Sequence, residues 1–391
     1  MNQIKVPYAV HALLFALLGL VPATSSADPV KTSPVGSKPP VNAAAPEEDL
    51  GPLLAKIRAK HDVPALCAAF VRHDRVTAIG VDGVRRRGDA TRATIGDLWH
   101  LGSCTKSMTA TLCAKLVEEK VLKFDDTLGR FEAGFFPNDA DAGWKNVTLE
   151  QLLTNRSGAP TDLSRDGLAG VLWRREGTPV EQRRRLFEGV LRHPPEQAPG
   201  TRFVYSNAGF SIAGIMAETR TKTAWEDLIR ARVFAPLGMT SAGFGPPGAP
   251  DVLDEPRAHT AAGVPVEPGI NADNPASIAP AGLVHMAIRD WAKYVAMHLL
   301  GARGESTFLS KASFARLHEP PKGFDYAMGW AVTERPWGGG TVLTHNGSNT
   351  MWFCVTWIAP RRDFAVLICC NQGGDAAAKA CDDVAAALVT R

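Results

Sequence analysis

Segments with strand character lie near both ends of this 391-residue chain, and most helical segments lie between them. Near the start, residues 65–72 and 76–84 are two predicted strands, joined as a hairpin by residues 73–75. Four later segments have the same character, at residues 327–334, 341–347, 351–359 and 364–370. Strands from the two ends can share one sheet if the middle of the chain is an insertion. We therefore predict an α+β fold, with an antiparallel sheet formed by both chain termini, flanked by helices, and an inserted helical subdomain at about residues 125–300.

Helical spacing of apolar residues, or a capping residue followed by an apolar run, marks the predicted helices. In the first of them, leucines and an isoleucine recur every three or four positions, despite Pro52 near its start. The predicted helices are residues 47–61, 103–119, 148–155, 287–300 and 374–390.

The N-terminal segment has the features of an export signal. Lys5 supplies a positive charge, residues 12–21 are a ten-residue apolar run, and the small residues Ser25 and Ala27 fit a cleavage site. A run of ten is too short to span a bilayer, which takes about 20 residues. We predict a signal peptide at residues 1–27, an exported (periplasmic or secreted) mature chain and no transmembrane span in it. An uncleaved anchor lying against the membrane is the alternative.

Residues 28–46 are rich in proline, alanine and small polar residues, which is typical of a flexible linker. Residues 47–391 are then expected to form one domain. A net charge of +3, with no basic run interleaved with aromatic residues, argues against a nucleic-acid partner. The seven cysteines have no metal-ligand spacing, and their apolar surroundings favour buried free thiols over disulfides.

Residues 101–110, LGSCTKSMTA, place Ser103 three residues before Lys106 at the start of a predicted helix. Positions three apart lie on one helix face, so the lysine amine can reach the serine hydroxyl. Serine is a poor nucleophile near pH 7 unless a neighbouring base takes its proton. The alternative is an ordinary helix start, with Ser103 as the capping residue and Lys106 on the surface.

Two further motifs carry groups of the kinds that acyl transfer needs. Tyr205-x-Asn207 offers a phenol that can shuttle a proton and an amide that can orient a substrate carbonyl; the alternative is a core tyrosine followed by a helix-capping asparagine. In residues 344–352, THNGSNTMW, Gly347 allows close backbone approach and the Ser348 N–H can stabilise an oxyanion. His345 can orient the substrate or the tyrosine; the alternative is a plain turn. The similar His100-Leu101-Gly102 is interpreted as incidental.

The order and flanks of these motifs resemble the serine hydrolase superfamily of class C β-lactamases, penicillin-binding DD-peptidases and related esterases. The resemblance runs from about residue 48 to the C-terminus. It is carried by the three motifs and by flanks at residues 100–128, 152–160, 199–218, 235–244, 279–294 and 344–360.

The resemblance implies a mechanism and a set of roles. Ser103 would attack a carbonyl to form an acyl-enzyme, and Lys106 with Tyr205 would take the proton and later deliver it to the leaving group. The backbone N–H groups of Ser103 and Ser348 would form the oxyanion hole, and Asn207 would hold the acyl side chain. No metal and no organic cofactor is implied.

Two departures from the family pattern bear on the substrate. Members that hydrolyse β-lactams well usually carry Lys-Thr-Gly where this chain has His345-Asn346-Gly347. A lysine gives a fixed charge for a substrate carboxylate, whereas histidine, with an ordinary pKa of about 6.5, is mostly neutral at pH 7. The other departure is Asn155-Arg156, where relatives commonly show His-Thr.

The sequence thus predicts an exported serine hydrolase that acts through an acyl-enzyme on an ester or amide, as a carboxylesterase or as a D-amino-acid peptidase of DD-carboxypeptidase type. Its partner would be a small-molecule ester, peptide or β-lactam substrate. The alternatives are a β-lactamase, a penicillin-binding sensor or pseudoenzyme that acylates without turnover, and a structural wall-associated domain. The oligomeric state and the natural substrate do not follow from the sequence.

Overall fold

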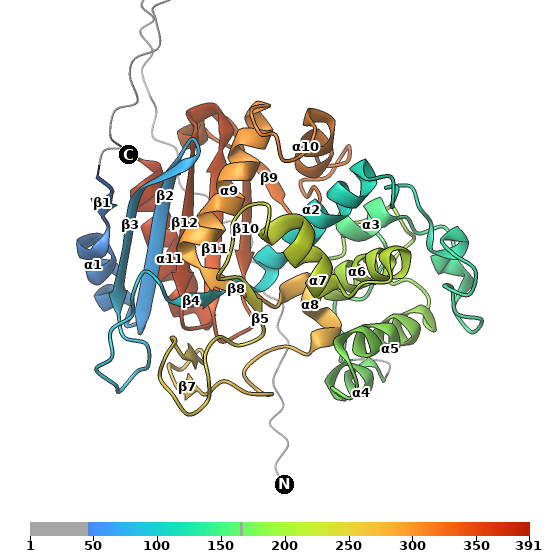
Figure 1. Ribbon diagram of the computed structural model, residues 1–391, viewed down its shortest axis with the longest axis horizontal. Coiled ribbons are helices and arrows are strands. Elements are labelled where there is room, and N and C mark those ends of the chain that lie inside the picture. Colours follow the sequence, from blue (N-terminus) through green and yellow to red (C-terminus); the bar gives the residue numbers. More distant parts are fainter. Residues whose placement is uncertain (1–45, 165–166) are drawn as a thin grey trace, which may run out of the picture. The chain divides into compact units, whose positions relative to one another are not determined.

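Strands from both ends of the chain form one large sheet (Figure 1). The computed structural model describes residues 46–164 and 167–391; the predicted signal peptide and, apart from Pro46, the predicted linker lie outside these residues. Residues 47–391 make one compact unit. Seven strands of this described part pair in the order β1 (Glu48–Asp49), β3 (Arg75–Gly83), β2 (Ala65–Arg72), β12 (Phe364–Cys370), β11 (Phe353–Ala359), β10 (Gly340–Gly347) and β9 (Ala331–Arg335). The α+β prediction is confirmed.

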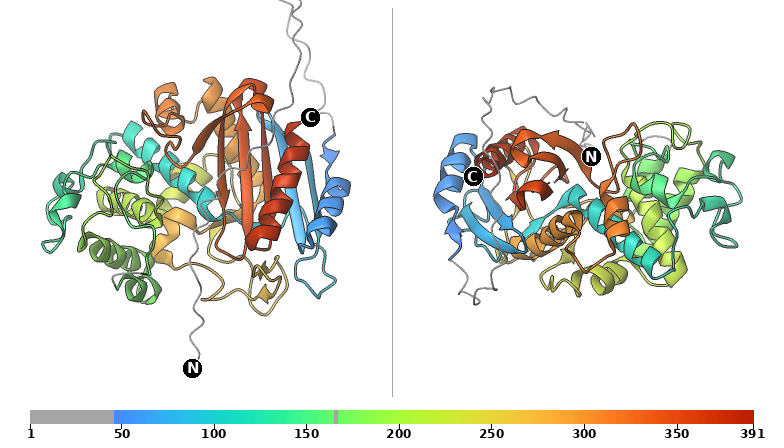
Figure 2. Two further views of the ribbon diagram at one scale, coloured as in Figure 1. Left: turned by 180° about the vertical axis from the view of Figure 1, so that it is seen from behind. Right: turned by 90° about the horizontal axis from the view of Figure 1, so that it is seen from above.

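The two ends of the chain meet at the pairing of β2 with β12, where Ala69 lies opposite Leu367. Both strands are almost continuously apolar because both faces of the sheet are covered. Residues of even number in β2 and β12 pack with α1 (Gly51–His61) and α11 (Gly374–Val389) on one face. Residues of odd number face the opposite core, where α9 (Ile288–Arg303) packs on the sheet. The two views in Figure 2 show these helices on opposite faces.

The predicted strands differ from the observed strands in two respects. The sheet is antiparallel except for the two-residue strand β1, which runs parallel to β3. The predicted strand at 327–334 is shorter, because residues 327–330 form a turn that ends before β9 begins. In that turn Gly329 has φ +78°, and a Cβ on it would lie 2.5 Å from the Cα of Ser107. The chain therefore leaves the sheet there to pack against a helix.

The regular elements between β3 and β9 are mainly helices, and Figure 2 shows most of these helices beside the sheet. They are α2 (Thr105–Glu118), α3 (Leu149–Leu153), α4 (Leu168–Trp173), α5 (Pro179–Leu191), α6 (Asn207–Thr221), α7 (Trp225–Ile229), α8 (Ala279–Gly282), α9 and α10 (Lys311–His318). Two small sheets of short strands lie in the same part of the chain. One is formed by β4 (Leu98–His100), β8 (Val284–Ala287) and β5 (Gly243–Phe244), and the other by β6 (Ala258–His259) and β7 (Pro265–Val266).

Helix α2 connects the two parts of the fold. Eleven of its fourteen residues are buried, against α6, α8 and α10 among others. A one-turn 3₁₀ helix, Gly102–Cys104, joins α2 to β4 and contacts β10 and β11 of the large sheet. The N-terminal end of α2 is thereby fixed from the sheet on one side and from the helices on the other.

A buried arginine ties three of the helices together. Arg183 of α5 donates to Glu218 of α6 (2.5 Å) and to Glu226 of α7 (2.7 Å). Its side chain is fully buried, and the pairing with both carboxylates raises its pKa against the opposing effect of burial. The loss of one partner of such an ion pair would destabilise the fold, because it would leave a buried charge without compensation.

All seven cysteines lie in the described residues, and all are buried and free, as predicted. The thiols of Cys104 and Cys354, which are far apart in the sequence, lie close together, with 3.6 Å between their sulfurs. No helix in residues 46–164 or 167–391 is long and apolar enough to cross a membrane.

Candidate active site

Ser103 lies in the 3₁₀ turn before α2, between the large sheet and the helices. Its hydroxyl caps no backbone group at the start of α2, which begins at Thr105 without a side-chain cap. Lys106 is not on the surface: its side chain is fully buried in the first turn of α2. The alternative interpretation of this segment, an ordinary helix start with Lys106 on the surface, is therefore wrong.

The Lys106 amine makes three hydrogen-bond contacts. Nζ lies 3.1 Å from Ser103 Oγ, 2.7 Å from Asn207 Oδ1 and 3.0 Å from the carbonyl oxygen of Ala281. The amide oxygen and the carbonyl can only accept hydrogen bonds. A neutral amine has two hydrogens and one lone pair, so its hydrogens satisfy these two acceptors. The lone pair is then left for the hydroxyl hydrogen of Ser103.

Burial lowers the pKa of Lys106 from its ordinary 10.5 to about 7, against a smaller opposing effect of Cys104. Desolvation disfavours the charged form of an amine, and no carboxylate touches this one among its contacts. A substantial part of the enzyme thus carries a neutral Lys106 at neutral pH. That is the protonation state in which the amine can accept a proton from Ser103.

Tyr205 lies over the same amine. Lys106 Nζ is 4.6 Å from the centre of the Tyr205 ring. Burial raises the pKa of the Tyr205 phenol, and a hydrogen bond with the Ser103 side chain opposes that effect. The phenol is therefore protonated at neutral pH and is a proton donor beside Ser103 and Lys106.

Asn207 is the first residue of α6, and Ser206, not Asn207, caps that helix: Ser206 Oγ accepts from the backbone N–H of Gly209 (3.3 Å). The amide of Asn207 is thus not consumed by capping. Its Oδ1 is taken by Lys106, so its N–H₂ group is the end that can serve a substrate carbonyl.

The end of β10 meets the 3₁₀ turn by backbone contact. A Cβ on Gly102, which has φ +47°, would lie 2.4 Å from the Ser348 nitrogen, and a Cβ on Gly347 would lie 2.0 Å from the carbonyl oxygen of Leu101. Only glycine permits this approach. It brings the backbone nitrogens of Ser103 and Ser348 close to the same contact, as a pair of oxyanion donors would require.

His345 faces Tyr205, with 6.4 Å between the ring centres, and both of its ring nitrogens have partners. Nδ1 lies 2.5 Å from the carbonyl oxygen of Asn346, and Nε2 lies 3.1 Å from the Tyr326 hydroxyl. Because a carbonyl cannot donate, Nδ1 carries the hydrogen. In the neutral ring Nε2 then accepts from Tyr326.

His100 is more than incidental, which corrects the interpretation from the sequence. It is buried; its Nδ1 accepts from the backbone N–H of Gly102 (3.1 Å), and its Nε2 lies 2.7 Å from Asp273. The other oxygen of Asp273 accepts from the Asn349 amide (3.0 Å). This buried chain links the residue before Ser103 to the residue after Ser348, and so supports both sides of the backbone donor pair.

All seven residues predicted for the site, Ser103, Lys106, Tyr205, Asn207, His345, Gly347 and Ser348, therefore come together in the structure. Sequence reasoning missed Tyr326, Asp273 and the carbonyl of Ala281. Tyr326 stands just before a predicted strand and carries no motif. Asp273 lies 173 positions from His100, and a backbone carbonyl has no signature in a sequence.

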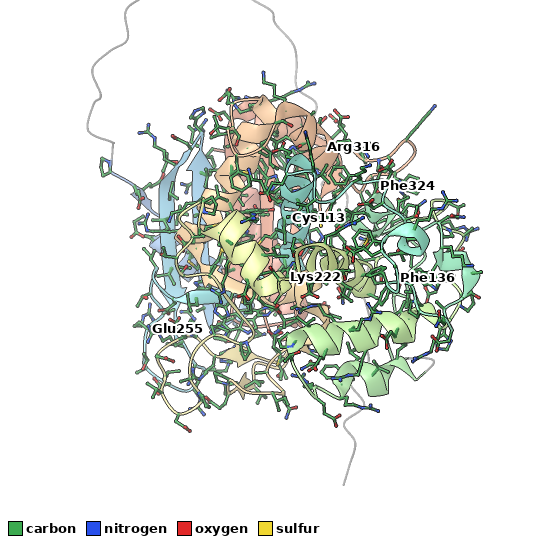
Figure 3. All side chains as sticks on the ribbon, turned by 45° about the vertical axis from the view of Figure 1, so that its right-hand side comes forward. Cys113, Phe136, Lys222, Glu255, Arg316 and Phe324 are labelled. Carbon is green, nitrogen blue, oxygen red and sulfur yellow. The ribbon has the colours of Figure 1, made fainter. Side chains whose placement is uncertain are left out.

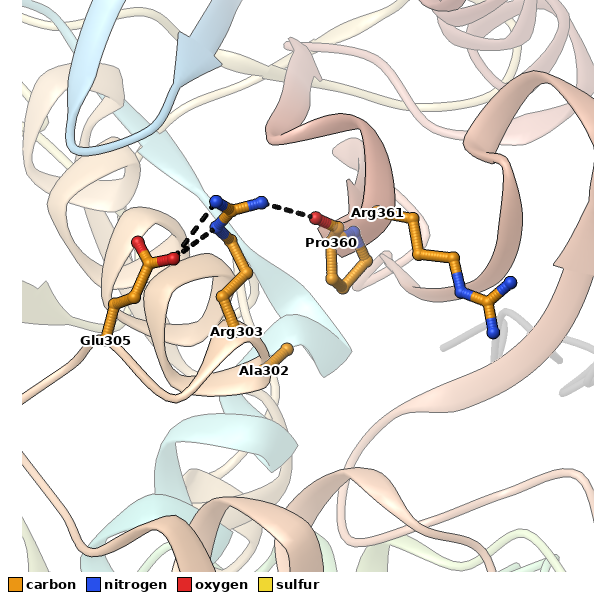
Figure 4. A pocket seen from close by; sticks show the side chains of 5 residues that line it. All are labelled: Ala302, Arg303, Glu305, Pro360 and Arg361. Carbon is orange, nitrogen blue, oxygen red and sulfur yellow. Dashed lines mark hydrogen bonds and ion pairs between the residues drawn. The ribbon is translucent and has the colours of Figure 1, made fainter. Parts of the chain in front are cut away.

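A surface hollow of about 300 Å³ lies elsewhere, lined by Ala302, Arg303, Glu305, Pro360 and Arg361. Figure 4 shows that Arg303 in it is paired with Glu305 and donates to the carbonyl of Pro360. None of the seven site residues lines it. In the part of the chain described, no group of three or more histidine, cysteine, aspartate or glutamate side chains could hold a metal ion.

Comparison with known proteins identifies the family to which this arrangement belongs. Residues 51–390 match the family described as Beta-lactamase. The chain belongs to the β-lactamase family. Penicillin-binding protein 4 of Amycolatopsis lactamdurans is 27% identical to this β-lactamase family member over 330 residues, which cover 81% of this chain and 83% of the relative.

Other relatives match over shorter stretches. A putative D-alanyl-D-alanine carboxypeptidase of Escherichia coli O157:H7 is 30% identical over 171 residues, 42% of this chain and 38% of the relative. Lovastatin esterase of Penicillium rubens is 27% identical over 172 residues, 41% of this chain and 42% of the relative. Members of the β-lactamase family such as these are serine hydrolases, and this chain is a serine hydrolase.

Solved structures show the same fold. The octameric penicillin-binding protein homologue from Pyrococcus abyssi superposes with a TM-score of 0.70 at 22% identity, covering 87% of this chain and 76% of that protein. The D-amino acid amidase from Ochrobactrum anthropi gives a TM-score of 0.69 at 21% identity, covering 87% and 97%. The β-lactamase and transpeptidase fold predicted from the sequence is confirmed.

Proposed function

We propose that this chain is an exported hydrolase that forms an acyl-enzyme on Ser103 from esters or amides that lack a free carboxylate beside the reacting carbonyl. The observation that carries the acyl-enzyme step is the set of three contacts of Lys106 Nζ. They leave the lone pair of a neutral amine for the Ser103 hydroxyl. Export is supported by the apolar run at residues 12–21 and the small residues after it.

In the first half of the reaction, Ser103 Oγ attacks the substrate carbonyl carbon and its proton passes to Lys106 Nζ. The carbonyl oxygen gains the negative charge and lies against the backbone N–H groups of Ser103 and Ser348. Losing one such donor typically costs a factor of about 10²–10³ in rate. The leaving group departs with a proton relayed from Lys106 through Tyr205, whose raised pKa keeps the phenol protonated between transfers.

In the second half, water attacks the acyl-enzyme carbonyl and gives its proton to Lys106, which is neutral again once the leaving group has taken the first proton. The bond to Ser103 Oγ breaks, the serine recovers its hydrogen, and the carboxylic acid leaves. Asn207 holds the acyl portion through its amide N–H₂ throughout, while its oxygen stays on Lys106.

The preference against carboxylates follows from His345. The family's lysine at this position would offer a permanent charge, but here both histidine nitrogens are occupied, by the Asn346 carbonyl and by Tyr326. The ring of His345 therefore has no free N–H group that could donate a hydrogen bond to a substrate carboxylate. The similarity to lovastatin esterase and to a D-amino acid amidase is consistent with ester or amide substrates of this kind.

A peptidase of DD-carboxypeptidase type is the second candidate, favoured by the 30% identity to a putative D-alanyl-D-alanine carboxypeptidase. The two are separated by a matched pair of substrates, N-acetyl-D-alanyl-D-alanine and its C-terminal amide. We expect at least tenfold higher kcat/KM for the amide. Faster cleavage of the free acid would favour the carboxypeptidase instead.

The acyl-enzyme is tested with the Ser103→Ala variant. We expect loss of p-nitrophenyl ester hydrolysis with an unchanged thermal transition, and loss of the mass adduct that a fluorophosphonate leaves on the parent enzyme. Full activity of this variant would refute the assignment. A chromogenic cephalosporin measured beside the esters tests the β-lactamase alternative, and a permanent β-lactam adduct without product tests the sensor alternative.

A further inference from the structure

Tyr205, to which the proposed mechanism assigns proton delivery, lies in a segment without regular secondary structure. Residues 203–206 fall between a turn and the start of α6, and no strand partner fixes them. The two backbone N–H groups on either side of Tyr205 nevertheless have partners. Val204 donates to the backbone carbonyl of Asn155 (2.8 Å), and Ser206 donates to Asn155 Oδ1 (3.1 Å). One residue therefore supplies both acceptors.

The backbone conformation of Asn155 makes this double contact possible. Asn155 follows α3 with φ +54°, in the left-handed region that asparagine tolerates better than most residues. Its turn is tied down by Arg156, which donates to the Gln151 carbonyl (2.8 Å) and accepts from Gly200 (2.7 Å). The side chain of Arg156 packs on the ring of Phe324, labelled in Figure 3. These contacts of Arg156 thus fix the position of the two acceptor oxygens of Asn155.

The amide nitrogen of Asn155 lies on the side of Tyr326, the second tyrosine of the site. Asn155 is 1% exposed. Burial raises the pKa of the Tyr326 hydroxyl, and a side-chain hydrogen bond with Asn155 opposes that effect. Tyr326 in turn holds His345. Asn155 consequently lies between the segment that carries Tyr205 and the residue that holds His345.

We propose that Asn155 is a positioning residue, whose backbone and side-chain oxygens hold the Tyr205 segment where its phenol can deliver a proton to the leaving group. This inference rests on the proposed function of Tyr205. It also gives a physical role to the Asn155-Arg156 pair, which departs from the family pattern. Asn155 itself touches neither Ser103 nor Lys106 by any hydrogen bond of the described chain, so it acts through Tyr205.

The choice of leaving group separates positioning of a proton donor from a general effect on folding. p-Nitrophenoxide leaves without needing a proton, whereas an alkoxide or an amine must be protonated as it departs. A displaced Tyr205 therefore slows the cleavage of alkyl esters and amides more than that of p-nitrophenyl esters. A displacement of about 1 Å can cost a factor of about 10².

The test compares three variants. Asn155→Gly keeps the positive φ and removes the side-chain acceptor, and Asn155→Asp keeps an acceptor for Ser206. Lys222→Gly changes another residue of positive φ, whose side chain is exposed, and is the control. For Asn155→Gly we expect kcat on an alkyl ester to fall about 10- to 100-fold, with KM within threefold and p-nitrophenyl acetate cleavage within threefold. Asn155→Asp should recover part of the loss, and Lys222→Gly should show none.

Equal losses on both ester types, or an unchanged kcat on the alkyl ester in a folded Asn155→Gly variant, would overturn the proposal. A lower melting temperature with an unchanged ratio of the two rates would do the same, since it would indicate a structural role alone. Ser103→Ala is assayed in parallel. If that variant keeps its activity, the proposed function fails; if it is inactive while Asn155→Gly shows no selective loss, only the role of Asn155 fails.

Discussion

A negative charge beside Lys106 should move the pH dependence of the reaction. In Asn207→Asp, a carboxylate of nearly the same shape replaces the amide whose oxygen lies 2.7 Å from Lys106 Nζ. At that distance and an effective dielectric constant of about 20, Coulomb's law gives an attraction of about 6 kcal/mol for the charged amine. Since 1.36 kcal/mol corresponds to a tenfold change, even half of this attraction, after the carboxylate's own desolvation, favours protonated Lys106 about 100-fold.

The neutral fraction of Lys106 sets the size of the effect. With a pKa of about 7, roughly half of the amines are neutral at pH 7. If the carboxylate restored the ordinary value of 10.5, about one in 3,000 would be neutral at that pH. For the parent enzyme we expect kcat/KM to rise as the pH increases through about 7, because Lys106, with its lowered pKa, loses its proton there and becomes the neutral base. For Asn207→Asp we expect a rate at least 100-fold lower at pH 7 and an inflection above pH 9.

The assay is the pH profile of kcat/KM for a p-nitrophenyl ester between pH 5 and 10, with Asn207→Ala as the matched control. The control loses the substrate contact of Asn207 without adding charge, so its rate falls while its inflection does not move as far upward. An inflection that stays near pH 7 in Asn207→Asp would refute Lys106 as the titrating base.

Three other changes follow from the structure. Gly102→Ala should cut kcat about 10²–10³-fold, since its Cβ would lie 2.4 Å from the Ser348 nitrogen; full activity of a folded variant would contradict the backbone donor pair. His345→Lys should raise kcat/KM for the free acid N-acetyl-D-alanyl-D-alanine relative to its amide by tenfold or more, and an unchanged ratio would show that the charge at this position does not select substrates. Arg183→Met should lower the free energy of unfolding by about 3–5 kcal/mol, because Glu218 and Glu226 lose their buried partner; denaturant titration measures this, and a change below about 1 kcal/mol would mean that the carboxylates find water or another cation.

The sequence predicted the elements that local pattern determines. The continuous apolar runs of β2 and β12 located the central strands, and the three-residue spacing of Ser103 and Lys106 placed their side chains on one helix face. Flanking matches to a known family supplied the order in which distant motifs meet. These are properties of short segments, and short segments are visible in a sequence.

The features of the fold and the site that the sequence did not predict depend on packing between distant segments. Gly329 fits against Ser107 only after α2 and β9 are in place, and this contact delays the start of the strand predicted at 327–334 to Ala331. Asp273 is the partner of His100 because the chain folds back across 173 positions. The departure at Asn155 was visible in the sequence, but its meaning required the distances to Val204 and Ser206.

The two glycines at the meeting of β10 with the 3₁₀ turn have a consequence for how such an enzyme can change its substrate. Gly102 and Gly347 leave no room for even a methyl group between the two backbones, so the slot that we propose for the substrate carbonyl has a width set by main-chain atoms. No side chain of those two positions can widen, narrow or charge it. New specificity must then come from residues that stand around the slot, such as His345 and the loops of the helical part, while the position of the reacting carbonyl stays constant.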